Sequence, residues 1–278
     1  MTSSEILLLA LATVFIGSGD LFGGIASRRS TPVSVAAWSQ LIGIPVVLVV
    51  AVVVGGQPTT SDLLFGAVAG LGSGLGVGAL YRGFSRSSVG IVAPTASTIA
   101  TMIPIAVGLL SGERPTLLVA LGLVVALPAI VLIGWSRDTH DHVRAGLGHG
   151  VVSGVGFGLM VVAYSMTDPA SGVWSVVAGR ISASTVLVLV IVLFGAGFAV
   201  ERDARSSTVL AGILPSVGLA AFVSAAQTAS LLILGVALAM MPTMTVVLAV
   251  IFLKERLATT QWFGIATAAL AIALISVG

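Results

Sequence analysis

Ten long apolar runs, divided by short polar or Pro/Gly breaks, make up almost the whole chain. A helix needs about 20 apolar residues to cross the hydrocarbon core of a bilayer. The runs are continuous and do not alternate apolar and polar residues with a period of two, so a membrane β-barrel is not expected. We therefore predict an all-α integral membrane protein with ten transmembrane helices. The runs cover residues 5–26, 33–54, 63–81, 88–110, 116–135, 147–167, 173–199, 208–228, 231–252 and 258–277.

Composition supports this fold class and excludes several functions. Only 8% of the residues are charged, whereas a soluble domain carries about 25%, so too few charges remain to cover a water-facing surface. The chain has no cysteine, which excludes disulfides and thiolate metal sites. It has no basic cluster with interleaved aromatic residues, so no nucleic-acid partner is expected. The first run lacks a positively charged start, and we interpret it as a span rather than a signal peptide.

A pair of charged residues reveals an internal repeat. Glu113-Arg114 follows the fourth run and Glu255-Arg256 follows the ninth, at an offset of 142 residues. The same offset places Thr101-Met102 on Thr243-Met244. Each unit holds five spans, an odd number, so the second unit enters the bilayer in the opposite sense; such inverted repeats are a transporter architecture. The predicted units are residues 1–135 and 147–278, joined by a polar linker at 136–146.

The repeated charged residues lie at a junction between two spans in each unit. Adjacent opposite charges at this place would fix the turn and its depth among the lipid headgroups. A gating ion pair with another loop is the alternative. The junction residues are Glu113, Arg114, Lys254, Glu255 and Arg256.

Basic residues are distributed unevenly between the loops. Ten of them follow odd-numbered runs, while Arg114 alone lies in the loops of the other side. Cytoplasmic loops carry an excess of Lys and Arg, so this bias places both termini outside. The ten residues are Arg28, Arg29, Arg82, Arg86, Arg137, Arg144, Arg202, Arg205, Lys254 and Arg256.

The two five-span units resemble the EamA-type transporters of the drug/metabolite transporter superfamily. The resemblance covers essentially the whole chain and implies ten helices, a central cavity between two inverted repeats, and alternating access. It also implies export of small metabolites, amino acids or toxic compounds, and cytoplasmic termini, in contrast to the charge bias. The residues that carry it are Tyr81-Arg82-Gly83-Phe84, Pro94, Pro104, Gly112-Glu113-Arg114 and Gly122, then Pro242, Lys254-Glu255-Arg256, Gln261 and Gly264.

Two charged residues interrupt the apolar runs. Asp20 lies toward the far end of the first run, and a carboxyl at this depth usually faces a cavity or a partner. It would couple protons or contact a substrate amine; alternatively, the span ends near Phe22 and water reaches Asp20. Arg180 lies about two turns into the seventh run, where it would bind a substrate carboxylate, pair with Asp20, or snorkel to the headgroups. Its equivalent in the first unit is Trp38, beside Gln40, and both are candidates to line the cavity.

Prolines inside the fourth and ninth runs indicate a substrate pathway. Pro94 and Pro104 bracket the fourth run and Pro242 lies within the ninth. Proline kinks a helix and frees a carbonyl, which can line a cavity. Nearby hydroxyls and methionines would contact the substrate or pack in the core. Besides Asp20, Trp38, Gln40 and Arg180, the predicted pathway residues are Tyr81, Thr98, Thr101, Met102, Tyr164, Gln227, Met241, Thr243 and Met244.

These features favour a secondary transporter, most simply an exporter, of small organic metabolites, amino acids or amphipathic compounds. No GxxxxGK[ST] loop is present, so an ion gradient, with protons as one candidate, or the substrate gradient would drive transport. A membrane-embedded lipid-handling protein or enzyme is the alternative, but no nucleophile–base pair is visible, so no enzyme is expected. We expect no cofactor and no metal; His140 and His142 are interpreted as part of a solvated linker. The predicted protein is a monomer or homodimer in the bilayer of a bacterial inner (plasma) membrane.

Overall fold

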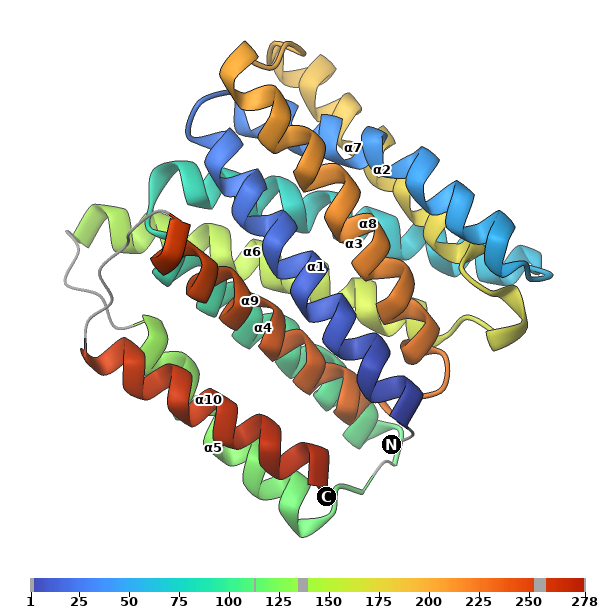
Figure 1. The fold of residues 1–278 in the computed structure, drawn as a ribbon, viewed down its shortest axis with the longest axis vertical. Helices are drawn as coiled ribbons and strands as arrows, with labels where there is room; N and C mark the ends of the chain where they lie inside the picture. Colours follow the sequence, from blue (N-terminus) through green and yellow to red (C-terminus); the bar gives the residue numbers. More distant parts are fainter. Residues whose placement is uncertain (1–2, 113, 135–139, 253–258, 278) are drawn as a thin grey trace.

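The computed structural model describes residues 3–112, 114–134, 140–252 and 259–277, which form a bundle of long α-helices (Figure 1). Within these ranges no β-strand is present. Two short 3-10 helices, η1 (Pro169–Ser171) and η2 (Arg202–Ala204), lie in connecting segments. The α-helices are α1 (Ser3–Ser27), α2 (Pro32–Val54), α3 (Thr60–Arg86), α4 (Val89–Leu110), α5 (Leu117–Gly134), α6 (His140–Ser165), α7 (Trp174–Phe194), α8 (Arg205–Ala226), α9 (Leu231–Phe252) and α10 (Thr259–Val277).

Seven helices within the described part of the chain are long and apolar enough to cross a membrane. These are α1, α2, α3, α4, α6, α7 and α8. Their length and composition support the predicted integral membrane protein, and the all-helical prediction agrees with the structure. The full set of ten spans stays a prediction.

The largest differences between the helix ends and the apolar runs lie at three places. α3 continues to Arg86, five residues beyond the predicted run, because its last turn holds arginines that suit a helix C-terminus. α6 begins at His140, inside the segment predicted as a linker. α7 ends at Phe194 because Gly195 adopts the left-handed conformation (φ 64°) that terminates a helix.

The two halves of the chain are interleaved. α1 packs on α8 just as α3 packs on α6, and α2 packs on α8 just as α3 packs on α7. α4 packs on α9, and α5 on α10. Exchanging the five helices of one half for those of the other reproduces these pairs, so the bundle has an approximate twofold relation. Figure 1 shows α5 and α10 side by side and antiparallel, as such a relation requires.

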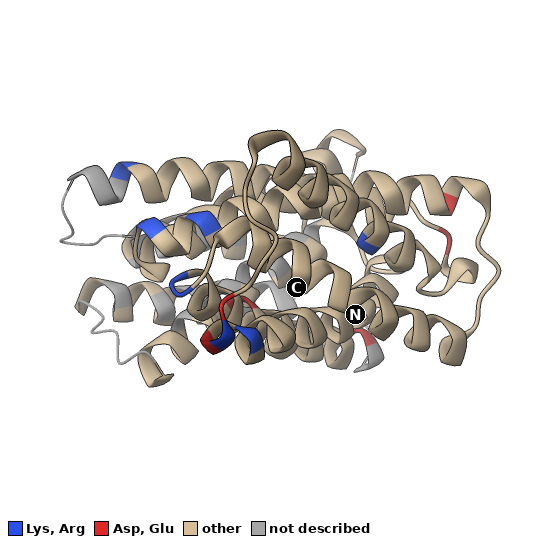
Figure 2. Ribbon diagram, turned by 90° about the horizontal axis from the view of Figure 1, so that it is seen from above, with Lys and Arg blue, Asp and Glu red and all other residues tan. Residues whose placement is uncertain are grey.

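The two ends of the bundle differ in charge. Figure 2 shows most of the Lys and Arg positions gathered at one end. We call this the arginine end; its loops are residues 28–31, 87–88 and 195–204. The opposite end holds the loops 55–59, 111–116, 166–173 and 227–230, and both chain termini lie there (Figure 1).

Glycines allow α3 to lie against two helices of the other half. A Cβ atom at Gly66 or Gly70 would overlap the backbone of Ser175 or Gly179 in α7, and one at Gly72 would overlap the backbone of α6. Small residues four apart let membrane helices approach closely, since no hydrophobic force drives helices together inside lipid. The glycines of α3 therefore serve close packing between the two halves.

A methyl group added at this contact should weaken the bundle. Gly70→Ala is expected to lower the free energy of unfolding by about 1–3 kcal/mol, the usual cost of overpacking. Thermal unfolding of the protein in detergent measures the change. Gly148→Ala is the control, because a Cβ there meets no atom within 4 Å. Equal stability of Gly70→Ala and the natural chain would contradict this packing.

Candidate functional site

A cavity of about 80 Å³ lies between the two halves of the bundle. This volume has room for several water molecules or a small ligand. Among the residues that the structure describes, those lining the cavity come from eight helices, four from each half, and none comes from α5 or α10. The lining residues are Ile16, Asp20, Gln40, Ser73, Val77, Leu80, Phe84, Ala93, Ala96, Ser97, Ala100, Phe157, Met160, Arg180, Pro215, Leu219, Phe222, Met241 and Thr245.

Asp20 reaches this cavity from within α1. The helix continues without a break to Ser27, so Asp20 is part of the span and does not lie at its wetted end. Gly19 allows the close approach of α8, because a Cβ there would overlap the ring of Pro215. Thr245 of α9 donates a hydrogen bond to the carbonyl oxygen of Gly17, at 3.1 Å. Contacts on both sides therefore hold this stretch of α1 and fix the position of the carboxyl.

Arg180 enters the cavity from α7 of the second half. Its side chain is only 4% exposed, so it does not snorkel to the surface. Nη1 donates to Oε1 of Gln40 in α2, while Nε has no hydrogen-bond partner among the described residues. Gly43 makes room beside the guanidinium, since its Cβ would lie 3.3 Å from Nε. The charge of Arg180 also interacts with the carboxyl of Asp20, so the two predicted charged residues share one site.

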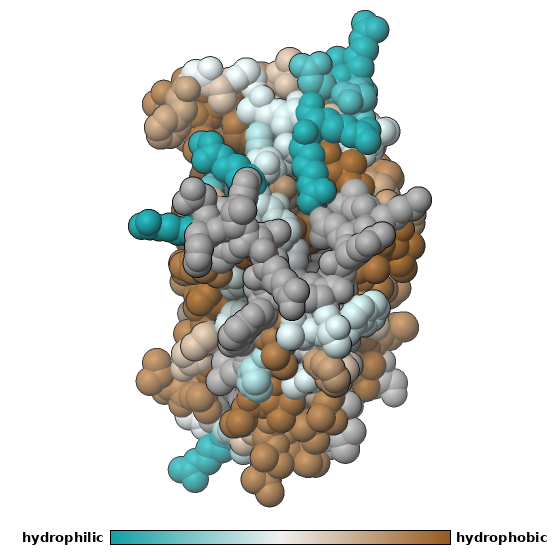
Figure 3. Space-filling view, turned by 90° about the vertical axis from the view of Figure 1, so that its left-hand side faces the viewer, coloured by the Kyte–Doolittle hydropathy of each residue, from teal (hydrophilic) through white to brown (hydrophobic). Residues whose placement is uncertain are grey.

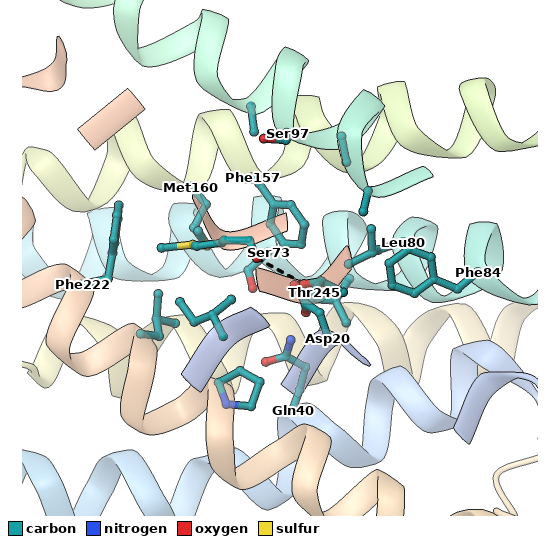
Figure 4. Close-up of a pocket in the computed structure, with 18 of the residues that line it drawn as sticks. Asp20, Gln40, Ser73, Leu80, Phe84, Ser97, Phe157, Met160, Phe222 and Thr245 are labelled. Atoms are coloured by element: carbon teal, nitrogen blue, oxygen red, sulfur yellow. Dashed lines mark hydrogen bonds between the residues drawn. The ribbon is translucent and has the colours of Figure 1, made fainter. Parts of the chain in front are cut away.

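The rest of the lining is mostly apolar. Figure 4 shows the rings of Phe84, Phe157 and Phe222 around the cavity, with the hydroxyl groups of Ser73, Ser97 and Thr245 between them. Ligand sites in proteins commonly combine apolar walls with a few placed polar groups. The arrangement suits a small organic molecule that has an apolar body and a charged or polar head.

The fourth span contributes to the cavity through a different face than predicted. Its lining residues are Ala93, Ala96, Ser97 and Ala100, which share one face because they are spaced three and four apart. Three other α4 residues, Thr98, Thr101 and Met102, are not among the residues that line this cavity, and their place in the substrate pathway stays a prediction. Thr98 bonds the carbonyl of Pro94 within its own helix, the buried hydroxyl of Thr101 has no partner among the described residues, and Met102 is 50% exposed.

The ninth span contributes Met241 and Thr245. Met241 was among the predicted pathway residues. Met244 does not line the cavity: it packs against α1, where a Cβ on Gly17 would lie 2.8 Å from its own Cβ. The side chain of Thr243 lies outside the described part of the structure.

Tyr81 and Tyr164 lie behind the cavity and do not line it. Both are fully buried, at 1% and 0% exposure. A Cβ on Gly23 would overlap the ring of Tyr81, and one on Gly179 would overlap the hydroxyl of Tyr164. The charge of Arg180 interacts with both hydroxyls. The two tyrosines therefore lie near the guanidinium of Arg180 without lining the cavity.

Two other predicted pathway residues lie at the ends of the bundle. Trp38 is 38% exposed and donates its indole N–H to the carbonyl of Phe198, at 2.9 Å. Gln227 lies at the opposite end, where its Nε2 donates to Oγ1 of Thr167 and to the carbonyl of Gly172. Neither residue lines the cavity, and their place in the substrate pathway stays a prediction. Each residue lies near the end of a helix, and its side chain donates a hydrogen bond to a neighbouring loop.

The predicted junction residues are mostly outside the described structure. Arg114 is exposed in the loop between α4 and α5. Glu113, Lys254, Glu255 and Arg256 lie outside the described residues, as do the side chains of His140 and His142.

The sequence analysis missed several lining residues. Pro215 lies within the eighth run and meets the same criterion as the prolines that were selected. Ser73 and Ser97 are small hydroxyl residues in glycine- and threonine-rich runs, where nothing local separates them from their neighbours. The three phenylalanines have no sequence signal at all, because a phenylalanine in a span usually packs in the core or against lipid.

Comparison with known proteins identifies the family. The model of the EamA-like transporter family matches the chain twice, over residues 3–135 and 144–277. The chain belongs to this family. A solved structure described only as "Crystal structure of protein" matches 100% of this chain and 98% of its own, with a TM-score of 0.75 and 18% identity, which shows a shared fold. No curated protein matches the sequence.

Membership of the EamA-like family confirms the resemblance stated above and the two-repeat architecture. The protein is a membrane transporter of small molecules and not an enzyme. The cavity between the two EamA repeats is therefore the candidate site for the transported molecule.

Cysteine labelling tests whether water reaches this cavity. The natural chain has no cysteine, so Ser97→Cys and Met102→Cys each introduce a single thiol on α4. We expect a hydrophilic thiol reagent to modify the Ser97→Cys protein at least ten times faster in proteoliposomes. The reason is that the reactive thiolate forms in water and not in lipid, and Met102 is exposed on the outside of the span. Faster labelling of the Met102→Cys protein would contradict the site.

Proposed function

We propose that this EamA family member is a secondary transporter that exports small organic metabolites, amino acids or amphipathic compounds by alternating access. The observation that carries the proposal is the shared cavity, to which the first half supplies Asp20 and the second supplies Arg180. A substrate bound there touches both repeats. Relative movement of the repeats would then change the substrate's access to the two sides of the membrane.

The lining favours a substrate with an apolar body and at least one charged group. The carboxyl of Asp20 lines the cavity and interacts electrostatically with Arg180. Nε of Arg180 also lacks a partner within that part of the chain. A ligand amine would satisfy the first group and a ligand carboxylate the second. A zwitterion such as an amino acid with an apolar side chain meets both requirements.

Two hydrophobic clusters lie on either side of the cavity and supply the barriers that alternating access requires. The cluster at the end of the bundle that faces away from the arginine end includes Leu9, Ala51, Val173 and Leu234. The cluster toward the arginine end includes Ala26, Val35, Val89, Ile191 and Val200. Each cluster packs side chains from both halves. Separating the halves at one end would open that cluster while the other stays closed.

Hydrogen bonds also join the two halves of the chain at each end of the bundle. At the opposite end, the backbone N–H of Gln57 donates to the carbonyl of Ala170, at 2.8 Å. Oδ1 of Asp62 there accepts from the backbone N–H of Asp168, also at 2.8 Å. At the arginine end, Oγ of Ser34 donates to the carbonyl of Gly197. Each set joins a loop or helix start of the first half to a loop of the second, so an opening movement at that end would break these bonds.

The proposal includes the finer predictions about architecture. The two units, residues 1–135 and 147–278, would each contribute five spans in opposite sense. The antiparallel neighbours α5 and α10 support this arrangement. Proton coupling through Asp20 is part of the proposal, because Asp20 is the only carboxyl among the described residues that line the cavity.

Counterflow in proteoliposomes tests the proposal directly. Amino acids, sugars, nucleosides and organic cations are screened for exchange by the natural protein. With the accepted substrate, Asp20→Asn and Arg180→Gln are each expected to lower exchange about tenfold or more, since a charge-assisted hydrogen bond contributes about 1.5–3 kcal/mol. Asp20→Asn should also remove any response to an imposed proton gradient.

The matched control is Arg114→Gln, which removes an exposed charge from a loop outside the cavity. It should exchange substrate at the natural rate. No exchange of any compound class by the natural protein would contradict the transporter proposal, and an unchanged proton response in Asp20→Asn would remove the coupling function from Asp20.

A further inference from the structure

A second hollow lies on the outside of the bundle, at the arginine end. It has a volume of about 500 Å³, within the range of about 300–1,000 Å³ that small-molecule sites occupy. It lies between α2 and α8, beneath the loop that joins α7 to α8. Its lining residues are Trp38, Ile42, Phe198, Ala199, Val200, Arg205, Thr208 and Val209.

The inner wall of this hollow, which we call the groove, is apolar, and contacts within the protein fix its side chains. The rings of Trp38 and Phe198 meet edge to face, with centroids 5.4 Å apart. The indole N–H is already bonded to the carbonyl of Phe198, and the hydroxyl of Thr208 to the carbonyl of Ala204. Both polar groups are therefore satisfied inside the protein. What remains for an occupant is an apolar surface formed by the two rings, Ile42 and Val209.

One charged group borders this surface. Arg205 is exposed, and its Nε donates to the carbonyl of Val200, at 3.2 Å. That bond fixes the guanidinium at the rim of the groove. Its terminal nitrogens have no hydrogen bond to any residue that the structure describes. They can bind an oxyanion in the forked geometry that arginine offers to phosphate.

The charge around the rim is mixed but contains several arginines. Arg202 precedes Arg205 by three residues, and the neighbouring α1–α2 loop holds Arg28 and Arg29. Glu201 and Asp203 are the acidic residues of the same loop. Figure 3 views this end of the molecule and shows hydrophilic residues gathered beside hydrophobic flanks. Such a boundary is where lipid headgroups meet acyl chains.

We propose that this groove binds one anionic phospholipid, with its phosphate on Arg205 and an acyl chain along Trp38, Ile42 and Val209. Charge complementarity selects the anionic lipid, since each basic residue near a membrane surface attracts anionic headgroups. The bound lipid bridges α2 of the first half and α8 of the second. It lies on the outer side of two helices whose inner sides carry Gln40 and Pro215, so it would stabilise the packing of the two halves.

Lipid titration of the purified full-length protein tests the proposal. Phosphatidylglycerol and phosphatidylcholine with identical acyl chains are added to the protein in nonionic detergent, and bound lipid is counted by native mass spectrometry. We expect one saturable phosphatidylglycerol site with at least tenfold preference over phosphatidylcholine. Arg205→Gln should weaken it about tenfold, and Val209→Phe should weaken it by filling the groove while leaving the charge in place. Arg114→Gln, at the other end, should bind as the natural protein does.

Several outcomes would overturn the proposal. Equal retention of the two lipids, or natural affinity in both Arg205→Gln and Val209→Phe, would mean that the lipid is bound elsewhere or without selectivity. Displacement of phosphatidylglycerol by millimolar inorganic phosphate would identify a plain phosphate site in place of a lipid site. If Arg205→Gln does not fold, the Val209→Phe protein decides alone.

Discussion

The buried charge of Arg180 is the constraint on which the arrangement of the two halves depends. Placing an unpaired charge in a low-dielectric interior costs several kcal/mol, so it must be compensated by nearby polar groups. Gln40 of the first half accepts a hydrogen bond from the guanidinium, which also interacts electrostatically with Tyr164 of the second half and with Tyr81 and Asp20 of the first. Removing either half would leave the other with an uncompensated buried group. The site therefore holds the repeats in register as well as offering charges to a ligand.

Close backbone contact makes this register possible. Gly66 and Gly70 let α3 lie against α7, and Gly179 admits the hydroxyl of Tyr164 one residue before Arg180. Gly19 and Gly43 do the same for Asp20 and for the guanidinium. Helices at this spacing meet through small residues with little side-chain interlocking. Such faces pack closely but have few obstacles to sliding, which is compatible with the proposed movement of the repeats in alternating access.

The sequence predicted that charged residues form a site inside the membrane better than it predicted which residues line that site. Charged residues inside apolar runs identified Asp20 and Arg180, because burying a charge in a membrane has so few explanations. Whether Arg180 snorkels or turns inward depends on Gln40, which comes from a helix 140 residues away in the chain. The proline-bearing fourth run contributes residues to the cavity, but Thr98, Thr101 and Met102 are not among them. The rotation of a uniformly apolar helix is set by tertiary contacts, so no periodicity reveals it.

Repeat and family could be predicted because they rest on local patterns. The Glu-Arg pair at two span junctions predicted two units, and the match of the EamA-like family to both halves confirms them. Trp38 and Gln227 show the limit of such reasoning. A polar residue near a span end has the same sequence context whether it faces a cavity or bonds to a loop, and here both bond to loops.

Cross-linking the two ends in turn tests alternating access most directly. The natural chain has no cysteine, so introduced cysteines can pair only with each other. Gln57→Cys with Ala170→Cys would join the two halves at the end of the bundle that faces away from the arginine end. Ser34→Cys with Gly197→Cys would join them at the arginine end. Both pairs replace residues that are already hydrogen-bonded to each other, which brings their Cα atoms near the spacing that a disulfide needs. The account predicts that oxidation of either pair stops substrate exchange and that reduction restores it, while each single variant exchanges normally. Undiminished exchange with either end fully cross-linked would contradict it.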